Sequence, residues 1–189
     1  MSRFRECLKE VLHHEGGWAN NPKDPGGATN KGVTIGTFRQ FYPGATVSDL
    51  RNITDIQLER IYKEGYWNPI DGDGLGPGVD LAVFDLAVNS GVGRAKSMFK
   101  QVMHLHRKDD AELIRQLCDN RLAFLKRLRH WNTFGRGWSR RVARIRAESL
   151  KALGSPYSDG KTVKVPSPSP KAKTLWVVLL ELLWRIFVR

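Results

Sequence analysis

Cysteine is scarce in this 189-residue chain, and so are clusters of metal-binding side chains. Cys7 and Cys118 are the only cysteines, and both fall on apolar stripes of predicted helices, which favours buried free thiols over a disulfide or a metal pair. His13 and His14 are adjacent, so on a helix they point in different directions and form no zinc motif. The Asp71-Gly72-Asp73-Gly74 run lacks most ligands of a calcium loop and is predicted to be a turn. The sequence therefore predicts no metal and no cofactor.

Acidic side chains are also in short supply. The chain has 31 Lys and Arg against 19 Asp and Glu, a formal net charge of +12, and a pI near 10.0. Between positions 121 and 151 there are ten Lys and Arg and a single acidic residue, Glu148. Such a surface suits nucleic acid, anionic lipid or an acidic polymer. No helix-turn-helix, zinc or RNA-binding signature accompanies the charge, so we predict no nucleic-acid partner.

Long hydrophobic runs are absent until the end of the chain. Residues 1–6 lack the apolar core of a secretory signal, so we expect no export by a cleaved signal. The fifteen residues 174–188 are apolar except for Glu181 and Arg185, and as a helix they reach about 22 Å, short of the roughly 30 Å hydrocarbon core of a bilayer. A linker rich in Pro, Ser and Lys, 154–173, precedes this run. We predict a main domain at 1–153 and a C-terminal membrane-binding helix at 174–189, which either spans the membrane or lies on it.

The stretch around Glu15 carries the first chemical signal. Four apolar residues recur at helical spacing before it: Phe4, Leu8, Val11 and Leu12. Glu15 is the next position of that stripe, and Gly16-Gly17 is predicted to end the helix in a left-handed conformation. Desolvation and the helix dipole both disfavour the Glu15 anion, so the sequence predicts a raised pKa, as a general acid near neutral pH requires. The alternative is an ordinary solvated residue in the last turn.

The residues after Glu15 favour the catalytic interpretation. Asp24 and Thr29 follow in a turn-rich segment, and Thr34 lies in a strand-like Val-Thr-Ile-Gly run. An acid at a helix end followed by an Asp and a Thr on a β segment is the layout of a lysozyme cleft, in which a second carboxylate and a hydroxyl act on water or on the developing positive charge.

The rest of the main domain reads as helical. A capping box at Thr54-Asp55-Ile56-Gln57 opens one helix, and a nearly continuous apolar run at 79–88 predicts a buried central helix. Asp85 and Asn89 on that helix either bind the neighbouring backbone or line the cleft. Further helices are predicted at 93–105, 110–130 and 138–153. The predicted class is α+β, mostly α, with a lysozyme-like fold and a short β segment beside the catalytic helix.

Several motifs together resemble glycoside hydrolase family 108. They are Glu15-Gly16-Gly17-Trp18, Asp24-Pro25-Gly26-Gly27, Thr29-Asn30-Lys31-Gly32-Val33-Thr34, Tyr66-Trp67-Asn68-Pro69, Ala87-Val88-Asn89-Ser90-Gly91 and Phe134-Gly135-Arg136-Gly137-Trp138 followed by Arg141-Val142. The resemblance covers roughly residues 3–153. The family comprises peptidoglycan N-acetylmuramidases, found as phage endolysins and as secretion activators.

The resemblance implies that Glu15 is the catalytic acid. Roles for Asp24, Thr29 and Thr34 in positioning water or stabilising charge follow only by analogy with other phage-type lysozymes. The candidate substrate-binding residues are Trp18, Asn30, Tyr66, Trp67, Asp85 and Asn89. Tyr66 and Trp67 could form the base of a sugar-binding site, although their spacing favours packing in the core. Residues 86–153, the helical half, are a candidate peptidoglycan-binding part.

The predicted function is hydrolysis of the β-1,4 bond between N-acetylmuramic acid and N-acetylglucosamine. The alternatives are a lytic transglycosylase and a non-catalytic cell-wall-binding module. The outcome at the anomeric carbon, retaining or inverting, depends on a carboxyl separation that the sequence does not give. We expect the protein at the cytoplasmic side of the bacterial inner membrane, held by residues 174–188, with a holin or another permeabilising agent giving access to the wall.

Overall fold

The computed structural model describes residues 2–20, 26–105 and 109–153. Asp24, the predicted linker and the predicted C-terminal helix lie outside the described residues. The described chain divides into two compact units, unit 1 up to Trp67 and unit 2 from Asn68 onward. No helix within the described ranges is long and apolar enough to cross a membrane. The class is α+β with helices dominating, as predicted, because the described strands form only one two-stranded antiparallel sheet.

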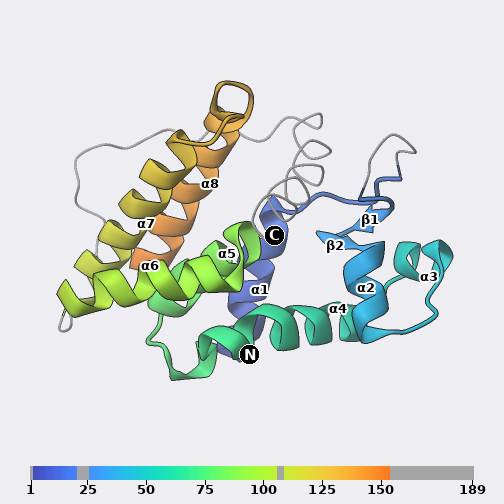
Figure 1. The fold of residues 1–189 in the computed structure, drawn as a ribbon. Coiled ribbons are helices and arrows are strands. Elements are labelled where there is room, and N and C mark those ends of the chain that lie inside the picture. The colour runs from blue at the N-terminus through green and yellow to red at the C-terminus, as the bar shows by residue number, and fades with distance from the viewer. Residues whose placement is uncertain (1, 21–25, 106–108, 154–189) are drawn as a thin grey trace. The chain divides into compact units, whose positions relative to one another are not determined.

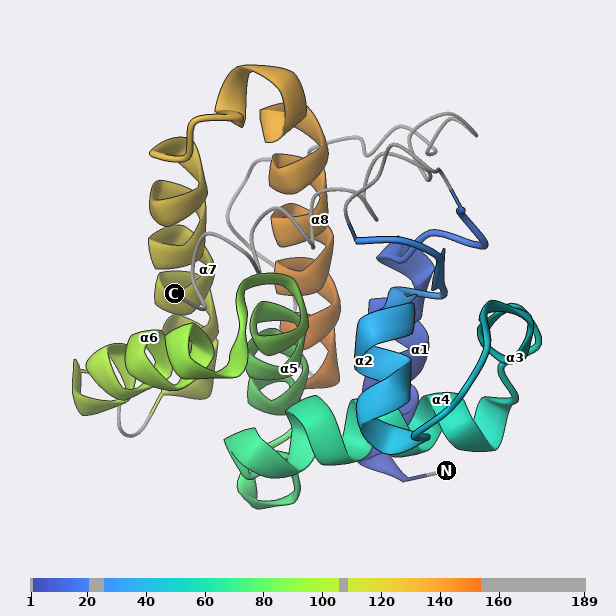
Figure 2. The same ribbon diagram turned by 45° about the vertical axis from the view of Figure 1, so that its right-hand side comes forward.

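Unit 1 contains four α-helices, one short hairpin and a π-helical turn among its described residues. In chain order they are α1 (Arg3–His14), β1 (Thr29–Asn30), β2 (Val33–Thr34), α2 (Ile35–Phe41), α3 (Val47–Arg51), α4 (Asp55–Tyr62) and η1 (Lys63–Trp67). The apolar stripe of α1 is buried as its spacing predicts. Its first turn packs on the end of η1, where the rings of Phe4 and Trp67 meet edge to face with centroids 5.5 Å apart. Figure 2 shows α4 passing the N-terminal end of α1.

Helix α1 ends where the sequence predicts, but the backbone conformation that ends it is different from the predicted left-handed glycine. Glu15 itself leaves the helix in an extended conformation, with φ −82° and ψ 149°, and its N–H donates to the carbonyl of Leu12. Neither Gly16 nor Gly17 has a positive φ. An extended C-cap turns the Glu15 side chain away from the helix surface without needing a left-handed glycine.

Helix caps account for two further boundaries. The capping box of Thr54 and Gln57 is present as predicted. The prediction that the strand continues to Gly36 is wrong, because the strand ends at Thr34 and α2 begins at Ile35. The Thr34 hydroxyl accepts a hydrogen bond from the N–H of Thr37, so it is an N-cap. Thr34 thus serves both elements, because its backbone ends β2 opposite Thr29 while its hydroxyl caps α2.

Unit 2 is built around one buried helix. Its described elements are η2 (Asn68–Ile70), η3 (Gly72–Gly74), α5 (Val79–Ser90), α6 (Val92–Leu105), α7 (Asp110–Lys126) and α8 (Trp131–Ala152). Every residue of α5 from Val79 to Asn89 is buried, which confirms the predicted central helix. Figure 1 shows α7 and α8 side by side as an antiparallel pair.

Helix α8 begins seven residues earlier than the predicted start at 138. Two glycines in its first turns made the segment look non-helical, since glycine lowers helix propensity. In the structure Gly135 lies under the Trp131 ring, and a Cβ at that position would come within 2.7 Å of ring atoms. The aromatic ring therefore uses the space that a side chain at Gly135 would occupy.

Gly78 fixes the contact between the start of α5 and the end of α8. Its φ is +86°, and a Cβ there would lie 2.2 Å from the backbone oxygen of Ser149. We expect Gly78→Ala to destabilise the protein by about 2–5 kcal/mol, combining left-handed strain with a backbone clash. Gly91→Ala is the matched control, because Gly91 has φ +87° but nothing within 4 Å of an added Cβ. Chemical denaturation of both variants measures the difference, and equal losses would contradict the clash.

Candidate functional site

The carboxyl of Glu15 lies buried at the end of α1, with the residue only 6% exposed. Glu15 leaves α1 in an extended conformation, and its carboxyl lies against the turn of the hairpin that follows. The core-facing position predicted from the sequence is therefore confirmed.

The hairpin turn packs directly against this carboxyl. β1 pairs with β2 through Thr29 with Thr34 and Asn30 with Val33, which leaves Lys31 and Gly32 as a two-residue turn. Both turn residues have positive φ, 48° and 79°, as a type I′ hairpin turn requires. A Cβ added to Gly32 would lie 2.9 Å from Oε2 of Glu15. The glycine thus allows the backbone of the turn to touch the carboxyl group.

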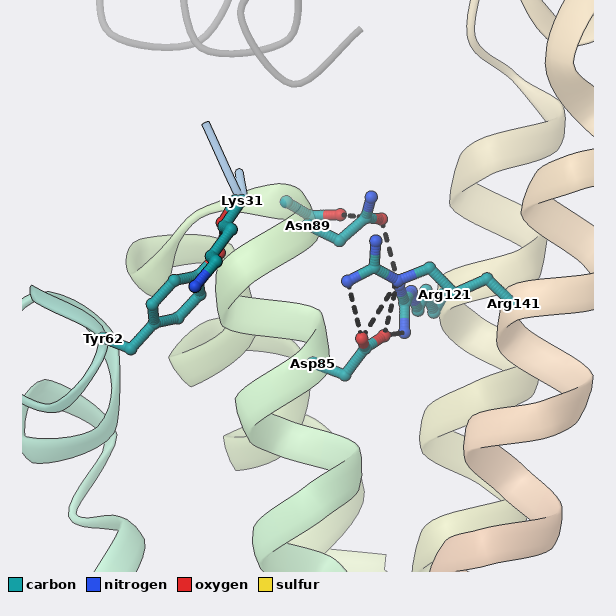
Figure 3. A network of polar contacts seen from close by, with 7 residues as sticks. Lys31, Tyr62, Asp85, Asn89, Arg121 and Arg141 are labelled. Carbon is teal, nitrogen blue, oxygen red and sulfur yellow. Dashed lines mark hydrogen bonds and ion pairs between the residues drawn. The ribbon is translucent and has the colours of Figure 1, made fainter. Parts of the chain in front are cut away.

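Two tyrosines complete this side of the site. The Tyr62 hydroxyl donates a hydrogen bond of 2.9 Å to the carbonyl oxygen of Lys31, as Figure 3 shows. Tyr66, one π-helical turn later, has its ring centroid 5.6 Å from that of Tyr62. Burial and the negative charge of Glu15 raise the pKa of Tyr66 to about 12, so the two side chains are electrostatically coupled. The sequence placed Tyr66 in the site, but it gave no sign of the role of Tyr62.

The two predicted catalytic threonines have different surroundings. Thr29 pairs with Ala19 through two backbone hydrogen bonds of 2.8 Å, which join the chain on either side of the segment that holds Asp24. Its hydroxyl is buried and has no hydrogen-bond partner among the described residues. The Thr34 hydroxyl is engaged in capping α2. The two hydroxyls therefore differ: that of Thr34 serves a helix cap, and that of Thr29 does not.

The predicted sugar-binding residues of unit 1 have mainly structural contacts. The amide nitrogen of Asn30 donates to the carbonyl oxygens of Leu50 and Arg51, at 3.1 and 2.9 Å, and so ties β1 to α3. Trp67 is fully buried, in agreement with the core packing that its spacing favours. Trp18 is half-buried, with the guanidinium of Arg51 5.7 Å from its ring centroid.

Asp85 and Asn89 belong to a buried polar network of unit 2. Asp85 is 0% exposed and accepts hydrogen bonds from Arg121 Nη1 at 2.6 Å and from Arg141 Nη2 at 2.7 Å. The Arg121 guanidinium also donates to Asn89 Oδ1 at 3.0 Å. Figure 3 shows Asp85 facing both arginines, which reach it from α7 and α8. The partners of Asp85 and Asn89 in this network are arginine side chains from α7 and α8, which sequence spacing did not reveal.

No three His, Cys, Asp or Glu side chains gather as a possible metal site within the described ranges. The described groups of the site are a buried carboxyl, two tyrosines and a buried hydroxyl. A buried carboxyl at a helix end behind a β-hairpin is the arrangement of an acid-dependent glycosidase.

Comparison with known proteins identifies the family to which this chain belongs. The family model described as Glycosyl hydrolase 108 matches residues 8–91, a range that includes Glu15, the hairpin and α5. The solved structure of SagA from Brucella abortus is similar over 80% of this chain and 96% of that chain, with 35% sequence identity and a TM-score of 0.71. No match was found among curated proteins. The chain belongs to glycosyl hydrolase family 108 and is a glycoside hydrolase.

Proposed function

We propose that this glycoside hydrolase is an N-acetylmuramidase, which cleaves the β-1,4 bond between N-acetylmuramic acid and N-acetylglucosamine in peptidoglycan. The observation that carries the proposal is the Glu15 carboxyl, buried at the end of α1 against the hairpin and inside the range that matches the family. The charge of the chain supports the substrate class, since a protein of +12 is attracted to glycan strands that carry acidic stem peptides.

In the proposed reaction Glu15 is the general acid. Its carboxyl proton passes to the glycosidic oxygen while the bond from that oxygen to the anomeric carbon breaks. Burial by itself disfavours the anion of Glu15, which is the direction that a general acid near neutral pH requires. Water then adds to the anomeric carbon and transfers a proton to a carboxylate.

Asp24 is the proposed second carboxylate, with Thr29 or Thr34 assisting it. The uncommitted hydroxyl of Thr29 favours Thr29 over Thr34, whose oxygen already serves as a helix cap. The two threonines can position water or stabilise the oxocarbenium-like charge by hydrogen bonding.

Digestion of purified peptidoglycan, followed by mass spectrometry of the fragments, tests this function. A muramidase leaves reducing N-acetylmuramic acid ends, and addition of water fixes their mass. A lytic transglycosylase breaks the same bond but adds no water to the anomeric carbon. It would therefore leave 1,6-anhydro ends that are lighter by one water, about 18 mass units. Binding without any fragment release would instead favour a non-catalytic wall-binding module.

The Asp24→Asn variant separates the roles in the second half of the reaction. We expect hydrolysis to fall by about 10²-fold or more while binding to peptidoglycan is retained, because the substitution removes a base but keeps a similar shape. Turbidity loss measures the rate, and co-sedimentation with the insoluble substrate measures binding. Full activity of the variant would assign the water-positioning role to a threonine or to a different carboxylate.

We also propose that residues 174–188 bind the cytoplasmic membrane. This apolar run follows a linker that carries Lys161, Lys164, Lys171 and Lys173, and basic residues beside a membrane segment stay on the cytoplasmic side, where they meet anionic lipid. Glu181 and Arg185 are costly in lipid, so the insertion is expected to be marginal. Wall access would then require permeabilisation, for which a holin is the proposed partner.

Truncation tests the membrane proposal. We expect deletion of residues 171–189 to move the protein from the membrane pellet to the soluble fraction and to leave cleavage of purified peptidoglycan unchanged. Fractionation and the turbidity assay measure the two effects. A wholly soluble full-length protein, or a truncated protein that does not fold, would contradict the anchor.

A further inference from the structure

The backbone of Gly32 forms a wall against the Glu15 carboxyl. A Cβ at Gly32 would lie 2.9 Å from Oε2 and 3.1 Å from Cγ of Glu15, and 2.5 Å from the Tyr62 hydroxyl oxygen. Any movement of the hairpin turn by a fraction of these distances therefore alters the space around the acid. The turn is therefore one backbone segment that can set where the Glu15 carboxyl lies.

Helix α4 holds this turn at two points. Near the end of α4, the Tyr62 hydroxyl donates to the carbonyl oxygen of Lys31 at 2.9 Å. At its start, Asp55 pairs with the Lys31 ammonium at 3.1 Å, but both groups are exposed, so that ion pair contributes little. Tyr62 is buried, with only 2% of its surface exposed. The tyrosine is thus the rigid attachment of the turn.

The turn needs such an attachment because its backbone is strained. Lys31 has a left-handed φ of 48° without being glycine, a conformation that costs about 1–2 kcal/mol for most L-residues. Strain of this kind persists only where the surroundings hold the chain in place, and it gathers at functional sites. The π-helix that begins directly after Tyr62 is a second uncommon element beside the same carboxyl.

We propose that Tyr62 is a positioning residue for Glu15, acting through the turn of Lys31 and Gly32. Its hydrogen bond to Lys31 holds Gly32 against the Glu15 carboxyl, which restricts the orientation of that carboxyl and keeps water from this side of it. The inference rests on the proposed role of Glu15 as the acid, and it adds a residue that touches neither the substrate nor the reacting atoms.

Two substitutions in the full-length protein test the proposal, each with a matched control. Tyr62→Phe removes the hydroxyl and keeps the ring, and Tyr42→Phe is its control on a tyrosine outside the turn. Gly32→Ala introduces a methyl group against both the Tyr62 hydroxyl and Glu15. Gly44→Ala is its control, because Gly44 has a similar φ of +82° but nothing within 4 Å of an added Cβ.

For Tyr62→Phe and Gly32→Ala we expect kcat on peptidoglycan to fall by about tenfold or more, with KM changed less than about twofold, since displacement of a catalytic group impairs the chemical step. Loosening of the turn in Tyr62→Phe admits water to the carboxyl and makes its anion less unfavourable. The alkaline limb of the pH–rate profile should therefore move to lower pH in this variant. Neither control should move kcat or the profile.

The titration of Glu15, followed by carbon-13 NMR of its carboxyl, gives a reading that does not depend on activity. Its midpoint should move to lower pH in Tyr62→Phe and stay in place in Tyr42→Phe. An unchanged midpoint with an unchanged pH profile would overturn the proposal, and so would a rate loss that only follows a lower melting temperature. If the wild-type protein releases no fragments, the proposed function fails, and the titration alone then decides whether Tyr62 positions Glu15.

Discussion

Replacement of Glu15 by glutamine is expected to abolish peptidoglycan cleavage and to leave the melting temperature within a few degrees of the wild-type value. The amide has nearly the same volume as the carboxyl, so the packing of Gly32 against it is retained. What is lost is the proton donor, and loss of a general acid lowers rates by about 10²–10⁴-fold. The turbidity assay measures the rate, and a thermal melt verifies folding.

The same substitution at an exposed glutamate of α1 is the control for Glu15→Gln. Glu6 lies on the same helix, is exposed, and pairs with Arg3 across one turn, so Glu6→Gln is expected to change neither the rate nor the stability noticeably. Activity above about a tenth of wild type in Glu15→Gln would be too high for loss of a general acid and would exclude Glu15 from that role.

Replacement of Asp85 is expected to have the largest effect on stability. Its carboxylate lies between the guanidinium groups of Arg121 and Arg141, and all three side chains are at most 2% exposed. Asp85→Ala would leave two buried cations without their counter-charge, and breaking a buried ion pair in this way costs about 3–5 kcal/mol. For a chain of this size that corresponds to a fall of about 6–20 °C in melting temperature.

A surface pair provides the comparison for Asp85. Glu148 and Lys151 lie 3.6 Å apart near the end of α8, with side chains that are 32% and 80% exposed, so Glu148→Gln should cost no more than about 0.5 kcal/mol. Calorimetry or thermal denaturation measures both variants. An Asp85 variant that kept its stability but lost cleavage would instead support the cleft-lining role considered from the sequence.

Local patterns predicted the parts of the fold that depend on local physics. The stripe of α1 and the buried run of α5 follow from helical periodicity, and the cap at Thr54 follows from its own side chain. Thr34 shows the limit of such patterns, because the residue ends a strand and caps a helix at the same time, and the local sequence does not say at which residue one element gives way to the other.

Within each unit, the contacts that the sequence did not reveal join residues far apart in the chain. Tyr62 reaches the carbonyl of Lys31, 31 positions earlier, and Arg141 reaches Asp85, 56 positions earlier. No periodicity within one helix encodes such a meeting. One signal was present for the arginines: Arg121 stands among buried apolar residues of α7, and a charge in such a place needs a partner of opposite sign.

The two buried cysteines give the protein a pair of built-in probes of local opening. Cys7 belongs to unit 1 and Cys118 to unit 2; neither is in a disulfide, and both are buried. Burial raises the pKa of the Cys118 thiol to about 11, so at neutral pH almost none of it is the reactive thiolate. A thiol reagent can therefore label each cysteine at an appreciable rate only when the surrounding helices separate. Labelling rates at the two positions, read by mass spectrometry, would report whether the acid-bearing unit and the helical unit open together or independently.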